Sequence, residues 1–174
     1  MNNTLYLDAH NNKYFKVLYK GVVYRDEDIS RDISNVFEKC DKISKIDKII
    51  FLRGPGSFTS LRIGATFAIA FAAARNIQIL GIRLFVLFEK AFPKHNIFFY
   101  TGTKKWIKRY KNTTKIIEKD SSEINEDKQW FSNAPERLEI KNNLLYPEVL
   151  LLMEKYHHLA NTNLDLIYPV TVFD

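Results

Sequence analysis

The sequence predicts an α/β protein with a mixed sheet and a smaller second lobe. Three observations support this fold class. Short apolar strands separated by turn residues open the chain, apolar residues at helical spacing follow, and a strand–turn–helix–strand unit occupies residues 47–82. Antiparallel strands that lead into a βαβ unit produce a sheet with both strand directions and with helices packed on it.

The composition is that of a globular protein. The 174 residues are 46% hydrophobic and 14% aromatic, which excludes a disordered chain, and the net charge of +6 is far below a histone-like excess. The single cysteine, Cys40, excludes a disulfide framework and a cysteine-built metal site. No secretory signal is recognisable, and the longest weakly charged run, residues 58–74, is too short to span a bilayer. We therefore expect a cytoplasmic protein without a membrane anchor.

The first elements are a meander and an amphipathic helix. Residues 5–7, 14–19 and 22–24 read as antiparallel strands, with turns at Asn11-Asn12 and Lys20-Gly21. Apolar residues then recur every three or four positions from 29 to 43 and form one stripe.

The next elements form a parallel βαβ crossover. A strand over 47–52 runs into a Gly-Pro-Gly-Ser turn, a long helix ends near Asn76, and a strand over 77–82 follows directly. A short helix is expected over 84–92.

The character of the chain changes after Pro93. Strands are expected over 96–100 and 106–110, residues 119–136 are polar and weakly periodic, and a last helix is expected over 146–159. We therefore divide the chain into an N-terminal lobe, residues 1–95, and a smaller C-terminal lobe, residues 96–174.

The helix after Gly56 is apolar nearly all round, with a polar edge at Arg62 and Thr66 only. Its sheet covers one flank, and a stripe of small residues remains on another. Either a helix of another protein or this chain's own first or last helix covers that stripe. The turn before the helix has the geometry of an anion site or of a tight turn capped by Ser57 or Thr59. It is not a P-loop, because no Gly-Lys-Ser or Gly-Lys-Thr follows.

Residues 54–64, Gly-Pro-Gly-Ser-Phe-Thr-Ser-Leu-Arg-Ile-Gly, closely resemble the signature of the TsaB (YeaZ) family, which has Gly where this chain has Ser60. The similarity covers residues 4–92, including a first strand that ends in Asp8. Tyr168-Pro169 resembles the family's C-terminal strand.

The resemblance implies an actin-like (ASKHA, ribonuclease H-like) fold and a non-catalytic scaffold subunit. The family belongs to the bacterial complex that forms N6-threonylcarbamoyladenosine at position 37 of tRNAs reading ANN codons. Its members pair with a TsaD-type catalytic subunit through their first two helices, a TsaE-type ATPase joins them, and tRNA is reached indirectly. Alone, they self-associate as homodimers through the same surface. No cofactor of its own is implied, and ATP or ADP is expected only at the interface of the complex.

The site residues follow from the signature and the helical stripe. The expected partner-binding residues are Ile33, Phe37, Leu61, Gly64, Ala65, Ala68 and Ala72. The expected signature-loop residues are Gly54, Pro55, Gly56, Ser57, Thr59 and Arg62.

The alternative is an active ATPase or phosphotransferase of the same superfamily. The family's first strand usually ends Asp-Thr-Ser, but here it ends Asp8-Ala9-His10, and no glycine follows an Asp by one or two positions. Asp8 is therefore interpreted as a cap at the strand end. The four histidines lack a His-x-x-x-His spacing, so no metal site is expected, and no catalytic residue is proposed.

A tRNA-binding module is a further alternative. Lys104, Lys105 and Lys108 alternate with Trp106 and Tyr110, a pattern that fits either contact with a nucleic-acid backbone or an edge strand protected by lysines.

Overall fold

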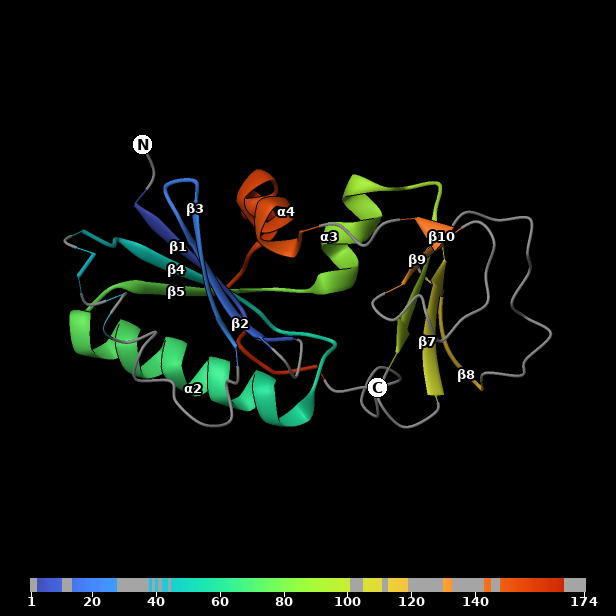
Figure 1. Cartoon of the computed structure of the whole chain (residues 1–174), viewed down its shortest axis with the longest axis horizontal. Helices are drawn as coiled ribbons and strands as arrows, with labels where there is room; N and C mark the ends of the chain where they lie inside the picture. The colour runs from blue at the N-terminus through green and yellow to red at the C-terminus, as the bar shows by residue number, and fades with distance from the viewer. Residues whose placement is uncertain are drawn as a thin grey trace.

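The computed structural model has two five-stranded sheets with helices beside them (Figure 1). It describes residues 3–10, 14–27, 38, 40, 42–43, 45–100, 105–110, 113–118, 130–132, 143–144 and 148–167. Most of the helix expected over residues 29–43 lies outside this set, as does Tyr168-Pro169.

The first sheet confirms the predicted mixed topology. It contains β1 (Thr4–Asp8), β2 (Tyr14–Tyr19), β3 (Val22–Glu27), β4 (Lys48–Leu52) and β5 (Gln78–Ile82) in the order β3-β2-β1-β4-β5. The β1–β2 and β2–β3 pairs are antiparallel, whereas β1–β4 and β4–β5 are parallel. The tight β2–β3 turn forms because Lys20 and Gly21 both adopt positive φ, 48° and 79°, as a type I′ hairpin requires.

Helices pack against both faces of this sheet (Figure 1). The long helix α2 (Phe58–Arg75) contacts β1, β4 and β5 on one face, and the short α4 (Val149–Lys155) contacts β1 and β2. Alternate residues of each strand therefore enter different cores. Leu7 and Phe51 pack with α2, whereas Leu18 and Ile50 pack with α3 (Leu84–Ala91) and α4.

The second sheet has the order β10-β9-β6-β7-β8. Its strands are β6 (Asn96–Tyr100), β7 (Lys105–Tyr110), β8 (Thr113–Glu118), β9 (Trp130–Ser132) and β10 (Asn143–Leu144). The sequence predicted β6 and β7, whereas it missed β8, and it missed β9 within a stretch that it reads as polar.

The chain then returns to the first sheet. After α4 comes a 3₁₀ turn, η2 (His157–Leu159), and Asn161 forms an antiparallel bridge with Gly81 of β5. The last predicted helix is thus shorter than expected and packs on the first sheet. No helix among the described residues is long and apolar enough to cross a membrane.

Candidate functional site

The signature loop joins β4 to α2 and fits only glycine at two positions. Gly54 has φ +105°, and a Cβ atom there would lie 2.5 Å from the Ile167 carbonyl oxygen. A Cβ atom on Gly56 would lie 2.6 Å from the His10 carbonyl oxygen. These neighbours are backbone atoms, so a side chain at either position forces the backbone to move. Gly54 and Gly56 are therefore packing requirements of the loop.

Backbone hydrogen bonds hold the loop between three other segments. The Ser57 N–H donates to the His10 carbonyl oxygen (2.9 Å), and the Leu84 N–H donates to the Gly54 carbonyl oxygen (2.9 Å). The loop is thus tied to the end of β1 and to the start of α3, and it fixes the point where α2 begins.

Neither Ser57 nor Thr59 caps α2. Ser57 makes no side-chain cap hydrogen bond, and its hydroxyl accepts one from the Ser60 hydroxyl at 3.1 Å. Thr59 lies within the first turn and is exposed. The expected side-chain cap is therefore wrong, and the helix starts from the backbone bonds of the loop instead.

Arg53 is a buried residue that the sequence did not single out. Its Nε donates to the Asp165 carbonyl oxygen at 2.7 Å, and its carbonyl oxygen accepts from the Ile167 N–H at 2.8 Å. Burial and the nearby charge of Arg83 lower the pKa of Arg53, while Asp165 opposes this change. The arginine thus attaches the C-terminal segment, residues 161–167, to the base of the signature loop.

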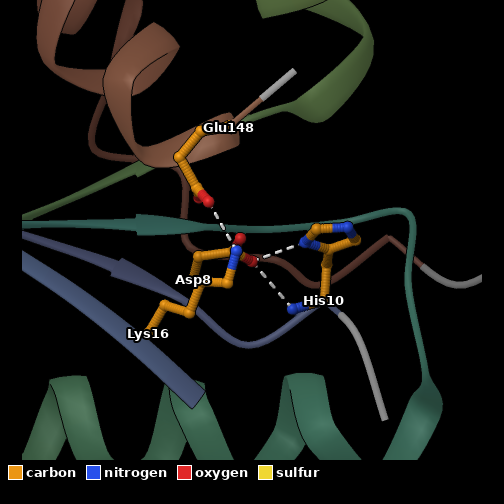
Figure 2. Close-up of polar contacts among 4 residues, drawn as sticks. All are labelled: Asp8, His10, Lys16 and Glu148. Atoms are coloured by element: carbon orange, nitrogen blue, oxygen red, sulfur yellow. Dashed lines mark hydrogen bonds and ion pairs between the residues drawn. The ribbon is translucent and has the colours of Figure 1, made fainter. Parts of the chain in front are cut away.

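Asp8 ends β1 and is buried together with His10, beside the partly exposed Lys16 and Glu148 (Figure 2). Its Oδ1 accepts the His10 N–H at 3.0 Å and lies 2.5 Å from the His10 Nδ1. Beside it, Lys16 is paired opposite Asp8 in the sheet and forms a 2.6 Å ion pair with Glu148.

The environment of Asp8 favours its ionised form. Burial raises the pKa of this carboxyl, but the charge interaction and hydrogen bond with the His10 ring, the His10 N–H and the charge of Lys16 together outweigh it. The pKa of Asp8 is therefore lower than usual. The structure supports the interpretation of Asp8 as a strand-end cap, since its Oδ1 binds two groups of His10.

The small-residue stripe of α2 faces the chain's own sheet. Its residues Leu61, Gly64, Ala65, Ala68 and Ala72 are all buried. A Cβ atom on Gly64 would lie 2.5 Å from the Cβ of Ala9, next to β1. The prediction that this stripe contacts a partner is wrong because glycine and alanine bring the helix close to the sheet. The alternative, in which this chain itself covers the stripe, agrees with the structure. The covering element, however, is the first sheet and not the first or last helix that we expected.

The opposite side of α2 is exposed and largely apolar. Phe58 and Ile69 are 54% and 47% exposed. The guanidinium of Arg62 lies over the Phe58 ring, 5.2 Å from its centroid. We name this side the outer face of α2; it consists of Phe58, Thr59, Arg62, Thr66, Ile69, Ala70 and Ala73.

The remaining predicted residues either lie outside the described part of the chain or belong to the second sheet. Ile33, Phe37 and Lys104 lie outside the described residues. Lys105 and Lys108 lie on β7, opposite Glu118 and Lys115 of β8. Within the described ranges, no three His, Cys, Asp or Glu side chains come together as metal ligands.

Comparisons with known proteins point to one family. The model of the family described as TsaD, tRNA N6-adenosine threonylcarbamoyltransferase, matches residues 26–92, a region that includes the signature loop and α2. No curated protein matches the chain.

Solved structures extend the similarity to nearly the whole chain. YeaZ from Pseudomonas aeruginosa is 17% identical, with a TM-score of 0.60 over 91% of this chain and 92% of that one. An uncharacterized protein with similarity to peptidase YeaZ, from the same organism, is 18% identical, with a TM-score of 0.60 over 91% of each chain. The chain therefore has the α/β fold of these two structures, which is the fold that the resemblance of its signature to the TsaB (YeaZ) family predicted.

Proposed function

We propose that this protein is a cytoplasmic, non-catalytic scaffold subunit of the complex that forms N6-threonylcarbamoyladenosine at position 37 of tRNAs reading ANN codons. It holds a TsaD-type catalytic subunit against the outer face of α2. Any ATP or ADP binds where the two subunits meet, and a TsaE-type ATPase and tRNA reach this chain through that assembly.

The exposed outer face of α2 is the observation that carries this proposal. A surface helix of a monomer ordinarily presents charged residues to water, but Arg62 is the one charged residue of the outer face. Its two large side chains, Phe58 and Ile69, lie only about 20° apart on a helical projection at about 100° per residue, so they mark the same side of the helix about three turns apart. Arginine is among the residue types enriched where binding energy is concentrated at interfaces, and here the Arg62 guanidinium lies over the exposed Phe58 ring.

The charged group at the end of β1 supports a non-catalytic role. A magnesium ion at Asp8 would compete with the His10 hydrogen bonds and with the nearby positive charge of Lys16. The Lys16–Glu148 ion pair also joins this end of the sheet to the residue before α4. These contacts favour a structural use of Asp8 over the active ATPase alternative.

Co-elution with the TsaD-like protein of the same host tests the interface. Ile69→Arg places a charge in the centre of the outer face, and we expect it to weaken the complex at least tenfold, an order of magnitude typical of a changed interface anchor. Leu151→Arg is the matched control because Leu151, on α4, is 52% exposed. Equal co-elution of both variants would contradict the proposed interface.

Reconstituted tRNA modification tests the absence of catalysis. Asp8→Asn keeps the size of the side chain and removes its charge, and we expect the rate of the complete complex to stay within about twofold, because no interaction of Asp8 made only in a transition state is lost. A rate loss of a hundredfold with intact co-elution would favour the ATPase alternative.

A further inference from the structure

We propose that Arg53 and Arg83 form a binding site for a terminal phosphate group at the carboxyl ends of β4 and β5. The two arginines directly follow these neighbouring strands, in which Leu52 pairs with Ile82. One more residue in the same parallel register places Arg53 beside Arg83, and the Arg53 N–H donates to the Ile82 carbonyl oxygen at 2.8 Å. Two positive side chains are thus neighbours at this end of the sheet, an arrangement that is unfavourable unless an anion lies between them.

The Arg53 side chain lies against both β5 and the C-terminal segment. A Cβ atom on Gly81 would overlap with the Arg53 Cδ and would lie 2.8 Å from its Cγ, so glycine is what leaves room for the stem of the arginine. Further along the side chain, Nε donates to the Asp165 carbonyl oxygen at 2.7 Å. Only 5% of Arg53 is exposed. The guanidinium is therefore fixed in place, and little side-chain freedom remains to be lost when a ligand binds.

Neither arginine has a carboxylate within ion-pair distance in the part of the chain that the structure describes. Among those residues, the Nε bond is also the one hydrogen bond of the Arg53 guanidinium, and its two Nη groups are not fully enclosed, so they remain in contact with solvent. Burial and the charge of Arg83 lower the pKa of Arg53, and the Asp165 charge opposes them only in part. The pair therefore lacks a counter-ion, which a buried cation ordinarily requires.

The charge and the depth of the site favour a phosphate monoester. Guanidinium groups offer paired N–H donors in the geometry that phosphate oxygens accept. The helix α3 begins directly after Arg83, with neither a side-chain cap nor an acidic residue in its first turn, so its N-terminus adds positive character. A monoester carries a charge of about −1.5 to −2 at pH 7 and projects from its carrier, so it can reach a buried arginine. The phosphodiester of RNA carries one charge and is flanked by two sugars.

The site is separate from the outer face of α2. It lies where β5 runs into α3 (Figure 1), and neither arginine belongs to that face. Because Arg53 directly precedes Gly54 and holds residues 161–167, a bound phosphate is expected to stabilise the base of the signature loop. This inference concerns the chain by itself and does not rest on the proposed catalytic partner.

Titration of the isolated chain with inorganic phosphate, followed by phosphorus-31 NMR at constant ionic strength, tests the site. We expect saturable binding with a dissociation constant on the order of 1 mM, typical of a small anion held by few contacts. Arg83→Gln removes one charge from an exposed side chain and is expected to weaken binding about tenfold. Lys90→Gln is the matched control, because it removes the same charge from an exposed side chain at the other end of α3, and it is expected to leave binding unchanged.

Melting temperatures without phosphate separate binding from folding. Arg83→Gln is expected to melt no lower than the wild type, because it removes a like charge from beside Arg53. A lower melting temperature would show that Arg83 makes a structural contact and would contradict the proposal. So would an absence of saturable phosphate binding by the wild type, or equal affinities of the wild type and Arg83→Gln.

Two adenosine compounds distinguish the kinds of phosphate. AMP carries a monoester, whereas adenylyl-3′,5′-adenosine carries the diester that is found in RNA. We expect AMP to compete with inorganic phosphate and the diester to bind about tenfold more weakly or less, because it carries less charge and cannot reach Arg53. Equal affinities for the two compounds would overturn the assignment to a monoester. All of these measurements use the isolated chain, so their failure is distinguishable from a failure of the proposed complex.

Discussion

Replacing Ala68 by tryptophan tests which side of α2 faces the sheet. Ala68 is completely buried in the core between α2 and the strands, in the same cluster as Phe71 and Leu7. Gly64, one turn earlier, leaves no space for even a methyl group, because its Cβ would lie 2.5 Å from that of Ala9. The stripe therefore has no room for an indole.

The expected cost is large relative to the stability of a small protein. Overpacking by a few methylene groups costs about 1–3 kcal/mol, and an indole is larger, so we expect a loss of about 3 kcal/mol or more. Total stabilities are about 5–15 kcal/mol, so Ala68→Trp removes a substantial fraction or prevents folding.

The matched control is Ala73→Trp, on the outer face of the same helix. Ala73 is exposed, and surface changes of this kind alter stability by about 0.5 kcal/mol or less. Urea unfolding followed by circular dichroism gives both values. Because Ala73 lies on the outer face, Ala73→Trp is expected to leave the fold intact and to weaken binding of the catalytic subunit proposed for that face. Equal unfolding midpoints for the two variants would refute the orientation of α2.

Two further predictions concern the end of β1 and the signature loop. Because the pKa of Asp8 is lower in the folded state than its ordinary value of 3.8, its contribution to stability is complete above that pH and is lost as the pH falls toward the folded pKa. Urea midpoints of wild type and Asp8→Asn should therefore differ at pH 7 and converge as the pH falls below about 4; a constant difference would contradict the inference. Gly56→Ala places a methyl group against the His10 backbone and should lower stability by about 1–3 kcal/mol, whereas Gly21→Asn, in an open turn with positive φ that asparagine tolerates, should change it little. Thermal unfolding compares the two, and equal melting temperatures would show that the loop relaxes freely.

The sequence predicted the strands and helices of the first sheet well because local chemistry defines them. Lys20-Gly21 specifies a hairpin turn, and the step from an apolar strand through glycines into a helix is short enough to be read without tertiary information. The second sheet was harder, because β9 has only three residues and pairs with β6, more than thirty positions earlier.

Periodicity identified the stripe of α2 but not its orientation. Helical spacing shows which residues share a side, and both sides of this helix are apolar, so composition alone could not decide which one meets the sheet. Phe67 and Phe71 are buried together with the small residues, whereas the side around Arg62 is exposed. The polar edge at Arg62 and Thr66 was the signal that marked the outward side.

The contacts of Arg53 and His10 were not visible in the sequence for a different reason. Arg53 bonds to backbone atoms more than a hundred positions away, in a segment without periodic pattern. His10 lies two residues after Asp8, and its role depends on how the chain bends after β1. Such contacts depend on the folded path of the backbone, which no short motif encodes.

The return of the C-terminal segment to the first sheet has a consequence for synthesis on the ribosome. The strands β1 to β5 are translated first, yet α4 covers β1 and β2, and residues 161–167 bond to Gly81 and Arg53. Until those last residues leave the exit tunnel, Leu18 and Ile50 lack the part of their cover that α4 provides, although α3 has already been made. The N-terminal half of the nascent protein therefore depends on completion of translation, and a transcript truncated before codon 149 yields a product that chaperones or proteases must handle.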